Sequence, residues 1–377
     1  MTNHKYLLKI TPLGTFFFGG EKTFTSASGE TNYFARSNFW PQQTTILGSL
    51  RYIVGKEKGF HTDKIGKHSF IANYNNGFGI ISKLSPVFLL SEHKDSISKK
   101  WIEAGSDYQF KKNSDELLRV YSNQMDGAQV VESDFFKIYA TGIAGKQQIP
   151  NLKFDYKEYL ISALYDSESK QNLINPMDKC VEQFQVGNMK SYSGGADDDA
   201  FFKQVFYKLH ENFSFGVYVE TTEELSFTNK KEIVAMGADQ SLFCMSFDKL
   251  KDDEEYIFEK IDKNNKKITG KGRVVLLSDA YVKPEILEKC SFAIADTVDF
   301  RNIITYEVDD GDNKKTELHY NIDTNSQNPG AARKSSVKYN LLKRGSVLFD
   351  TDLSAIEDLL KNYSFNKIGY NHFEVTN

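Results

Sequence analysis

The chain has 377 residues, of which 40% are hydrophobic and 26% are charged, and this composition excludes a wholly disordered or collagen-like chain. No apolar run reaches the ~18 residues that a membrane-spanning helix needs, so we expect no membrane partner. The three cysteines, Cys180, Cys244 and Cys290, lie far apart, which argues against a disulfide framework and a four-cysteine zinc site. The first residues lack the apolar core of a signal peptide, and we therefore expect a cytoplasmic protein.

Charge is unevenly distributed, although the net charge is only −4. Residues 1–60 contain seven basic and three acidic residues (+4), and residues 324–349 contain five basic residues and no acid (+5). Local charge, rather than the total, sets the field that a polyanion meets. Two interpretations stay open: the two segments line one groove, or they form two separate solvated faces.

The first half of the chain is predicted to contain one βαββαβ unit. We predict a strand, a helix begun by Pro41, two strands joined as a hairpin, a short helix stopped by Gly237 and a final strand, over residues 6–10, 42–54, 201–209, 213–220, 229–236 and 241–247. This order is that of the ferredoxin-like fold. The insertion at about 56–200 is too long for a loop; we expect residues 80–90 and 156–164 to be ordered, and the polar stretch 91–122 to lack regular structure.

The second half is predicted to repeat this order in a degenerate form. We predict strands over residues 273–282, 337–342, 345–349 and 370–375. Helices are predicted over residues 284–289 and 353–360, the second capped by Thr351 or Asp352. The predicted fold class is therefore α+β, with tandem ferredoxin-like (RRM-like) domains at 1–250 and 251–377.

No catalytic motif of a hydrolase, zinc protease or P-loop enzyme is present, and the seven histidines are scattered. The run Ser-Gly-Gly-Ala-Asp-Asp-Asp at 193–199 is similar to the metal-binding Gly-Gly-Asp-Asp hairpin of nucleotidyl cyclases and polymerases. Because Ala196 interrupts that pattern, we favour a solvated acidic turn. We expect neither a metal nor a cofactor.

The start of the first predicted helix is the best candidate for phosphate binding, because free N–H groups of a first helical turn attract anions. Gln43 and Thr44 stand in that turn, and Gly48 and Arg51, three residues apart, share a face on which a guanidinium can pair with a phosphate oxygen. The alternative is a glycine needed for packing beside an arginine in a surface ion pair.

Several glycine-rich segments are together similar to a known family. Residues 12–18 (PLGTFFF), 41–51 (PQQTTILGSLR), 186–187, 236–241 (MGADQS), 344–349 (RGSVLF) and 369–373 (GYNHF) resemble motifs of the CRISPR-associated RAMP proteins, above all the third subunit of the type III-B (Cmr) effector complex. The resemblance implies a non-catalytic RNA-binding subunit that holds the 5′ handle of the CRISPR RNA. It also implies three partners: the large polymerase-like subunit, the backbone RAMP subunit and, indirectly, target RNA.

With this resemblance, we expect the two basic segments to converge and twelve residues to contact RNA, namely Lys22, Arg36, Gln43, Thr44, Gly48, Arg51, Lys190, Arg333, Lys334, Lys338, Lys343 and Arg344. One alternative is a metal-independent RAMP endoribonuclease that processes the CRISPR RNA precursor, with His4, or His372 beside Tyr370 and Lys367, as candidates. The other alternative is a scaffold that contacts only protein.

Overall fold

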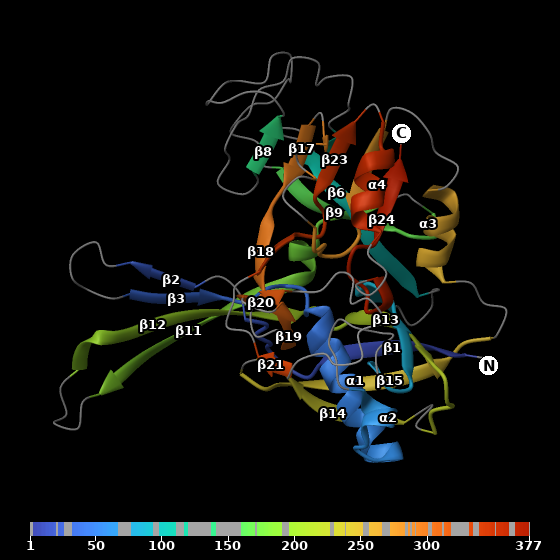
Figure 1. Cartoon of the computed structure of the whole chain (residues 1–377). Helices are drawn as coiled ribbons and strands as arrows, with labels where there is room; N and C mark the ends of the chain where they lie inside the picture. The colour runs from blue at the N-terminus through green and yellow to red at the C-terminus, as the bar shows by residue number, and fades with distance from the viewer. Residues whose placement is uncertain are drawn as a thin grey trace.

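A computed structural model describes most of the chain (Figure 1). The described residues are 3–19, 22–25, 32–66, 77–92, 98–110, 117–119, 137–140, 160–169, 172–190, 196–226, 230–237, 239–251, 256–265, 272–282, 286, 289–290, 292–300, 304–310, 313–317, 332–334, 339–350, 352–361 and 366–376. In this part of the chain, no helix combines the length and apolar character that crossing a bilayer requires.

The largest sheet belongs to the first half of the chain and to the insertion. Its order is β10-β9-β6-β5-β13-β1-β15-β14, with β4 beside β13 and β7 beside β6. The strands are β1 (His4–Pro12), β4 (Ile81–Leu84), β5 (Phe88–Ser91), β6 (Lys99–Phe110), β7 (Leu117–Arg119), β9 (Leu160–Asp166), β10 (Leu173–Ile174), β13 (Phe213–Thr221), β14 (Lys231–Met236) and β15 (Ser241–Lys249).

Helix α1 (Gln43–Lys58) contributes one apolar face to the main core of this sheet. Ile46, Leu50 and Ile53 are buried there against Leu8 and Phe215, at the helical spacing predicted from sequence. The short helix α2 (Thr62–Ile65) follows α1. The predictions of the first strand, the first helix and the strand at 241–247 are thus confirmed, and α1 extends four residues beyond its predicted end.

A second sheet has the order β24-β16-β23-β17-β8. It comprises β16 (Gly272–Leu276), β17 (Phe292–Ala295), β23 (Val347–Asp350) and β24 (Phe373–Thr376), together with β8 (Lys137–Ala140) from the insertion. Helix α4 (Ser354–Leu360) packs on it through Ile356 and Leu360. Asp352, a predicted cap, accepts a hydrogen bond from the Ser354 N–H at 3.0 Å. Most of the predicted helix at 284–289 lies outside the described residues.

The two sheets share an order of strands. The large sheet contains the order β15-β1-β13-β5, and the second sheet contains β24-β16-β23-β17. If the four strands of each unit are numbered along the chain, both orders read 4-1-3-2. All neighbouring strands in these sets are antiparallel. Between the sheets, α3 (Ile257–Asn265) packs against β24, where Asn265 bonds to Phe373 and Val375.

Smaller elements complete the described structure. The pair β18 (Thr297–Phe300) and β22 (Tyr339–Leu342) forms a two-stranded sheet, and β20 (Asn313–Glu317), β19 (Ile304–Asp310) and β21 (Ala332–Lys334) form a three-stranded one. A short 3₁₀ helix, η2 (Pro176–Lys179), precedes β11.

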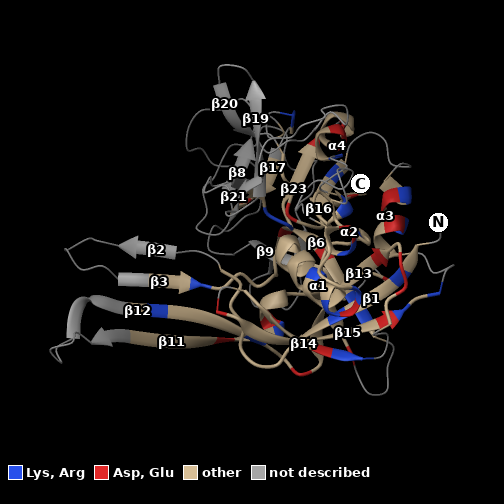
Figure 2. Cartoon of the chain, turned by 60° about the horizontal axis from the view of Figure 1, so that its bottom comes forward, with Lys and Arg blue, Asp and Glu red and all other residues tan. Residues whose placement is uncertain are grey.

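A four-stranded arm projects from the body (Figures 1 and 2). Its order is β11-β12-β3-β2, formed by β11 (Cys180–Lys190), β12 (Ala196–Leu209), β3 (Asn32–Arg36) and β2 (Lys22–Thr25). The predicted hairpin between 201–209 and 213–220 is therefore wrong. The turn at His210 is present, but β12 pairs with β11 and β3 in the arm, whereas β13 pairs with β1, β4 and β5 in the large sheet.

Two further predictions were wrong. Residues 229–236 were predicted as a helix, but 231–236 form β14, whose alternating burial marks a strand with one buried face. The polar stretch 91–122 was expected to lack regular structure, but it contains β6 and β7. β6 buries Glu103 and Asp107 completely, because both carboxylates have arginine partners.

Candidate nucleic-acid interface

The arm brings three of the predicted RNA-binding residues to one sheet. Lys22 begins β2 and lies opposite Ala35, Arg36 ends β3 opposite Val205, and Lys190 ends β11. The Arg36 side chain is 43% exposed and pairs with Glu182 at 3.0 Å. The side chains of Lys22 and Lys190 lie outside the described residues.

The arm also exposes large apolar side chains that the sequence analysis did not identify. Phe184 and Val186 on β11 are each 57% exposed, and the Lys203 ammonium lies 4.5 Å from the centre of the Phe184 ring. In Figure 2 the described part of the arm is drawn mostly tan, with basic positions on β3 and β12 and an acidic one on β11. An exposed ring beside a cation is the arrangement on which single-stranded nucleic acids stack a base. The alternation of polar and apolar residues at 183–186 (QFQV) was the available signal.

On α1, Gly48 and Arg51 have different environments. Gly48 is exposed, and a Cβ added there would meet nothing within 4 Å, so this glycine is not required for packing. Arg51 donates from a terminal guanidinium nitrogen to the Gly77 carbonyl at 3.0 Å, and burial lowers its pKa to about 10. Its guanidinium is thus held largely inside the protein.

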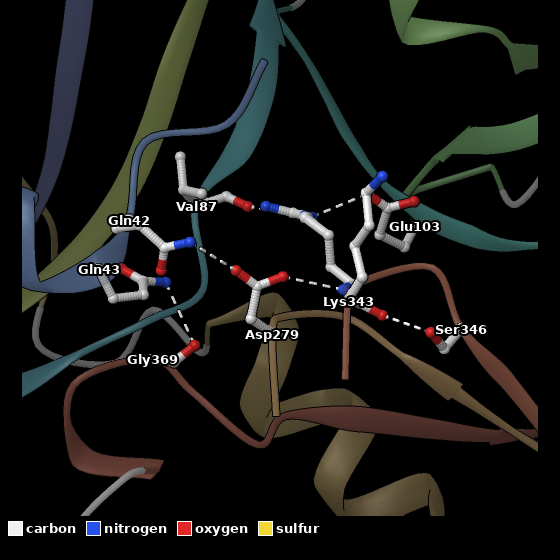
Figure 3. Close-up of polar contacts among 9 residues, drawn as sticks. Gln42, Gln43, Val87, Glu103, Asp279, Lys343, Ser346 and Gly369 are labelled. Atoms are coloured by element: carbon white, nitrogen blue, oxygen red, sulfur yellow. Dashed lines mark hydrogen bonds and ion pairs between the residues drawn. The ribbon is translucent and has the colours of Figure 1, made fainter. Parts of the chain in front are cut away.

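The first turn of α1 is capped from within the chain. Gln43 is buried and donates to the carbonyls of Ser85 (3.1 Å) and Gly369 (3.2 Å) (Figure 3). The Tyr370 hydroxyl donates to Gln42 at 3.0 Å and accepts hydrogen bonds from the backbone of Gln43 and Thr44. The prediction that these N–H groups and Gln43 face a phosphate is therefore corrected: Tyr370 occupies that position.

Arg344 is likewise buried, with only 7% of the residue exposed. Its Nε donates to Glu103 at 2.8 Å, and a terminal nitrogen donates to the Val87 carbonyl at 2.9 Å (Figure 3). The guanidinium also lies 3.8 Å from the centre of the Trp40 ring. A guanidinium enclosed in this way does not reach a phosphate at the surface, and this predicted contact is corrected. The neighbouring Lys343 is exposed and pairs with Asp296 at 3.3 Å.

The two basic segments of the sequence do meet, but inside the molecule. Trp40 and Gln42 come from the first segment and Arg344 from the second, and Asp279 joins them by accepting from Gln42 (3.1 Å) and from the Arg344 backbone N–H (2.9 Å). Their meeting place is a packed polar junction. Of the remaining predicted residues, Arg333 and Lys334 lie on β21 with side chains outside the described residues, and Lys338 lies outside them entirely.

Two of the candidates for acid–base chemistry, His372 and Tyr370, are also internal. His372 is 4% exposed, its Nε2 lies 3.0 Å from the Asn366 carbonyl, and burial lowers its pKa. Tyr370 is fully buried, and burial raises its pKa. Within the described ranges, no group of three or more His, Cys, Asp or Glu side chains is placed to hold a metal ion. The glycines at 194–195 lie outside those ranges, and residues 196–199 begin β12.

Comparisons with known proteins give one family. A family model described as "CRISPR-associated protein (Cas_Cmr3)" matches residues 8–373. No curated protein matches the chain. A chain in the cryo-EM structure of the Type III-B Cmr-beta bound to cognate target RNA is 13% identical, with 98% of this chain and 96% of that chain covered and a TM-score of 0.47. A chain from the same assembly bound to target RNA and AMPPnP, state 1, is 12% identical, with 97% and 94% covered and a TM-score of 0.44.

Proposed function

Because this chain belongs to the Cas_Cmr3 family of CRISPR-associated proteins, we propose that it is a non-catalytic, RNA-binding subunit of a type III-B CRISPR effector complex. In this proposal it holds the 5′ handle of the CRISPR RNA. It joins the large polymerase-like subunit to the backbone RAMP subunit, and it meets target RNA only through the complex. The observation that carries the proposal is the family match over residues 8–373, nearly the whole chain.

The fold is proposed to be a pair of ferredoxin-like domains. The shared strand order of the two sheets supports this, as do α1 after the first strand of one unit and α4 before the last strand of the other. In the first unit β14 stands where the second helix of the fold is expected. The boundary near residue 250 is crossed by the insertion, because β8 pairs with β17 of the second sheet.

The RNA contacts are proposed to lie on the arm and at basic positions of the second unit, rather than at the start of α1. Support comes from the half-exposed Arg36 guanidinium and from the exposed Phe184 ring beside Lys203. Lys22 and Lys190 belong to the same sheet, and Arg333, Lys334, Lys338 and Lys343 remain proposed contacts. Cations pair with phosphates while rings stack on bases, so the arm offers both parts of single-strand recognition.

The endoribonuclease alternative has less support. A general base must reach the hydroxyl that it deprotonates. His372 and Tyr370 are buried and bonded within the protein, so neither presents a base to solvent. His4, half-buried at the start of β1, is the remaining candidate.

The arm assignment is tested by two matched variants. Arg36→Gln and Lys249→Gln each remove a cation that pairs with one carboxylate, and the side chains are 43% and 41% exposed, but Lys249 lies at the end of β15 in the body. Binding of a labelled 5′-handle RNA, measured as a function of salt, should weaken for Arg36→Gln with a salt slope smaller by about one counterion. Lys249→Gln should bind like the parent. Equal binding by both variants contradicts the arm assignment.

A further inference from the structure

The junction between the two sheets is built from buried charges that come from opposite sides. β6, a strand of the insertion, contributes Glu103 and Asp107 to it, and both are fully buried. Their partners are Arg344 and Arg273, which are 241 and 166 residues away in the sequence and belong to the second unit. Each arginine thus neutralises a carboxylate of the other unit.

Backbone contacts reinforce these ion pairs. The Ser106 N–H donates to the Gly345 carbonyl at 2.7 Å, which fixes β6 to the turn before β23. Gly105 has φ +111°, and a Cβ there would approach Val347 to 2.8 Å, so the glycine lets β6 lie directly against the second sheet. β6 therefore pairs within the large sheet and packs against the other one.

A second set of contacts ties the same junction to α1. Asp279, in the loop after β16, accepts from Gln42 and from the Arg344 backbone, and Arg344 in turn bonds to Val87 (Figure 3). The Arg344 guanidinium also lies on the Trp40 ring. Burial raises the pKa of Asp279. Loss of the Arg344 side chain would leave the Glu103 charge buried without this partner, which a low-dielectric interior strongly disfavours.

We propose that this junction is a lock that holds the two units as one rigid body, and that Arg344 is a positioning residue for RNA binding rather than an RNA contact. The lock orients α1 and the second sheet, so that surfaces on both units meet a ligand without rearrangement. The statement about RNA rests on the proposed function, whereas the lock itself does not.

The variant that separates the two roles of Arg344 is Glu103→Gln. If Arg344 contacts phosphate, removing a negative charge beside it should leave RNA binding unchanged or tighten it. If Arg344 acts through the lock, the same variant should weaken the binding of labelled 5′-handle RNA about fivefold or more, with an unchanged salt slope because no phosphate contact is lost. Lys343→Met, which removes the exposed neighbouring cation at a proposed RNA contact, is the comparison: it should reduce the salt slope of binding and leave the junction intact.

The lock is also measured without RNA. Hydrogen exchange of the Ser106 amide should be at least tenfold faster in Glu103→Gln and Arg344→Lys than in the parent, while amides of β1 in the main core exchange as before. The fluorescence of Trp40, measured in a Trp101→Phe background, gives a second signal of the junction, because the Arg344 guanidinium lies on the Trp40 ring. If Glu103→Gln does not fold, Arg344→Lys, which keeps the charge but loses the planar fork, supplies the same readouts.

The outcomes are distinct. Unchanged exchange at Ser106 in both variants overturns the lock. Faster exchange with tighter or unchanged RNA binding in Glu103→Gln overturns the positioning role of Arg344. If the parent chain itself binds no handle RNA, the proposed function fails, while the exchange data still decide whether the lock exists.

Discussion

Three arginines that are equivalent in the sequence have different roles in the structure. Arg36 lies half-exposed on the arm, Arg51 is held against the Gly77 carbonyl, and Arg344 is enclosed by Glu103 and Trp40. A guanidinium serves equally well in a buried ion pair and in phosphate recognition, since both use the same planar set of donors. The family resemblance therefore predicted that the two basic segments converge, but the local sequence did not predict that the charge of Arg344 would be neutralised inside.

At the residue scale, Gly48 gives a direct stability prediction. Glycine in the middle of a helix costs roughly 0.5–1 kcal/mol relative to alanine, and an added Cβ would meet nothing within 4 Å. Gly48→Ala should therefore raise the free energy of unfolding by about that amount, as measured by thermal or urea melting. A lower stability would show that α1 is packed at this position.

A bulkier side chain at Gly48 tests the interface assignment. Gly48→Leu should also fold, because the site is open, but it should hinder pull-down of partner subunits or handle RNA if this face of α1 is covered in the complex. Normal assembly by a folded Gly48→Leu chain would show that this face of α1 is not covered in the complex.

At the element scale, β14 shows where the sequence pattern was ambiguous. Its six residues are too few to separate a helical from a strand period, and Gly237 ends either element. Pairing with β15 decides that this segment is a strand, and in this pairing Met236 lies opposite Ser241. Gly237 closes this hairpin with φ +82°, a conformation that other residues rarely adopt.

Gly237→Ala should therefore destabilise the protein. A Cβ at this position would lie 2.3 Å from the Phe17 carbonyl, and the positive φ adds roughly 1–2 kcal/mol of strain. Urea unfolding should show a loss of at least about 1 kcal/mol. If Gly237→Ala unfolds at the same urea concentration as the parent, the turn has a different conformation in solution.

The elements that the sequence predicted well are those with strong local signals. Helix α1 has Pro41 before it and an apolar face at helical spacing, and β15 alternates along its length. Two of the errors concern long-range pairing. β12 ends at the predicted turn but pairs in parallel with β3, and the two carboxylates of β6 pair with arginines more than 150 residues away. For the candidate site, the family resemblance identified sequence motifs that lie together in the structure. Which of their side chains are exposed depended on tertiary contacts that the sequence does not show.

At the scale of the whole molecule, stability should depend on pH through His372. The ring lies between β24 and α3, near Phe258 and Asp262, with Lys83 also within electrostatic reach. Burial lowers its pKa below the ordinary histidine value of 6.5, although Asp262 acts in the opposite direction. The unfolded chain therefore binds a proton that the native chain does not, and stability is lost as pH falls through about 6.5.

His372→Gln removes this titration and keeps a side-chain donor for the Asn366 carbonyl. The parent should lose about 1 kcal/mol more stability than this variant between about pH 7.5 and pH 5.5 in urea titrations. Equal losses by the two chains would mean that His372 has the same pKa in the native and the unfolded chain, which contradicts the lowering by burial.

The same architecture explains why we regard the protein as a holder of RNA. Two similar sheets are joined by a buried charged junction, and one arm projects with an exposed ring and cations. A fixed body with a projecting arm suits recognition of a short single strand, because little ordering is needed when the ligand binds.

The most direct measurement incubates the purified full chain, without metal, with end-labelled RNA that carries the repeat-derived 5′ handle, next to an RNA of scrambled sequence. Complex formation and RNA length are read from native and denaturing gels of the same samples. We predict tighter binding of the handle RNA and an RNA of unchanged length. Cleavage that His4→Ala abolishes, or equal failure to bind both RNAs, would contradict the account.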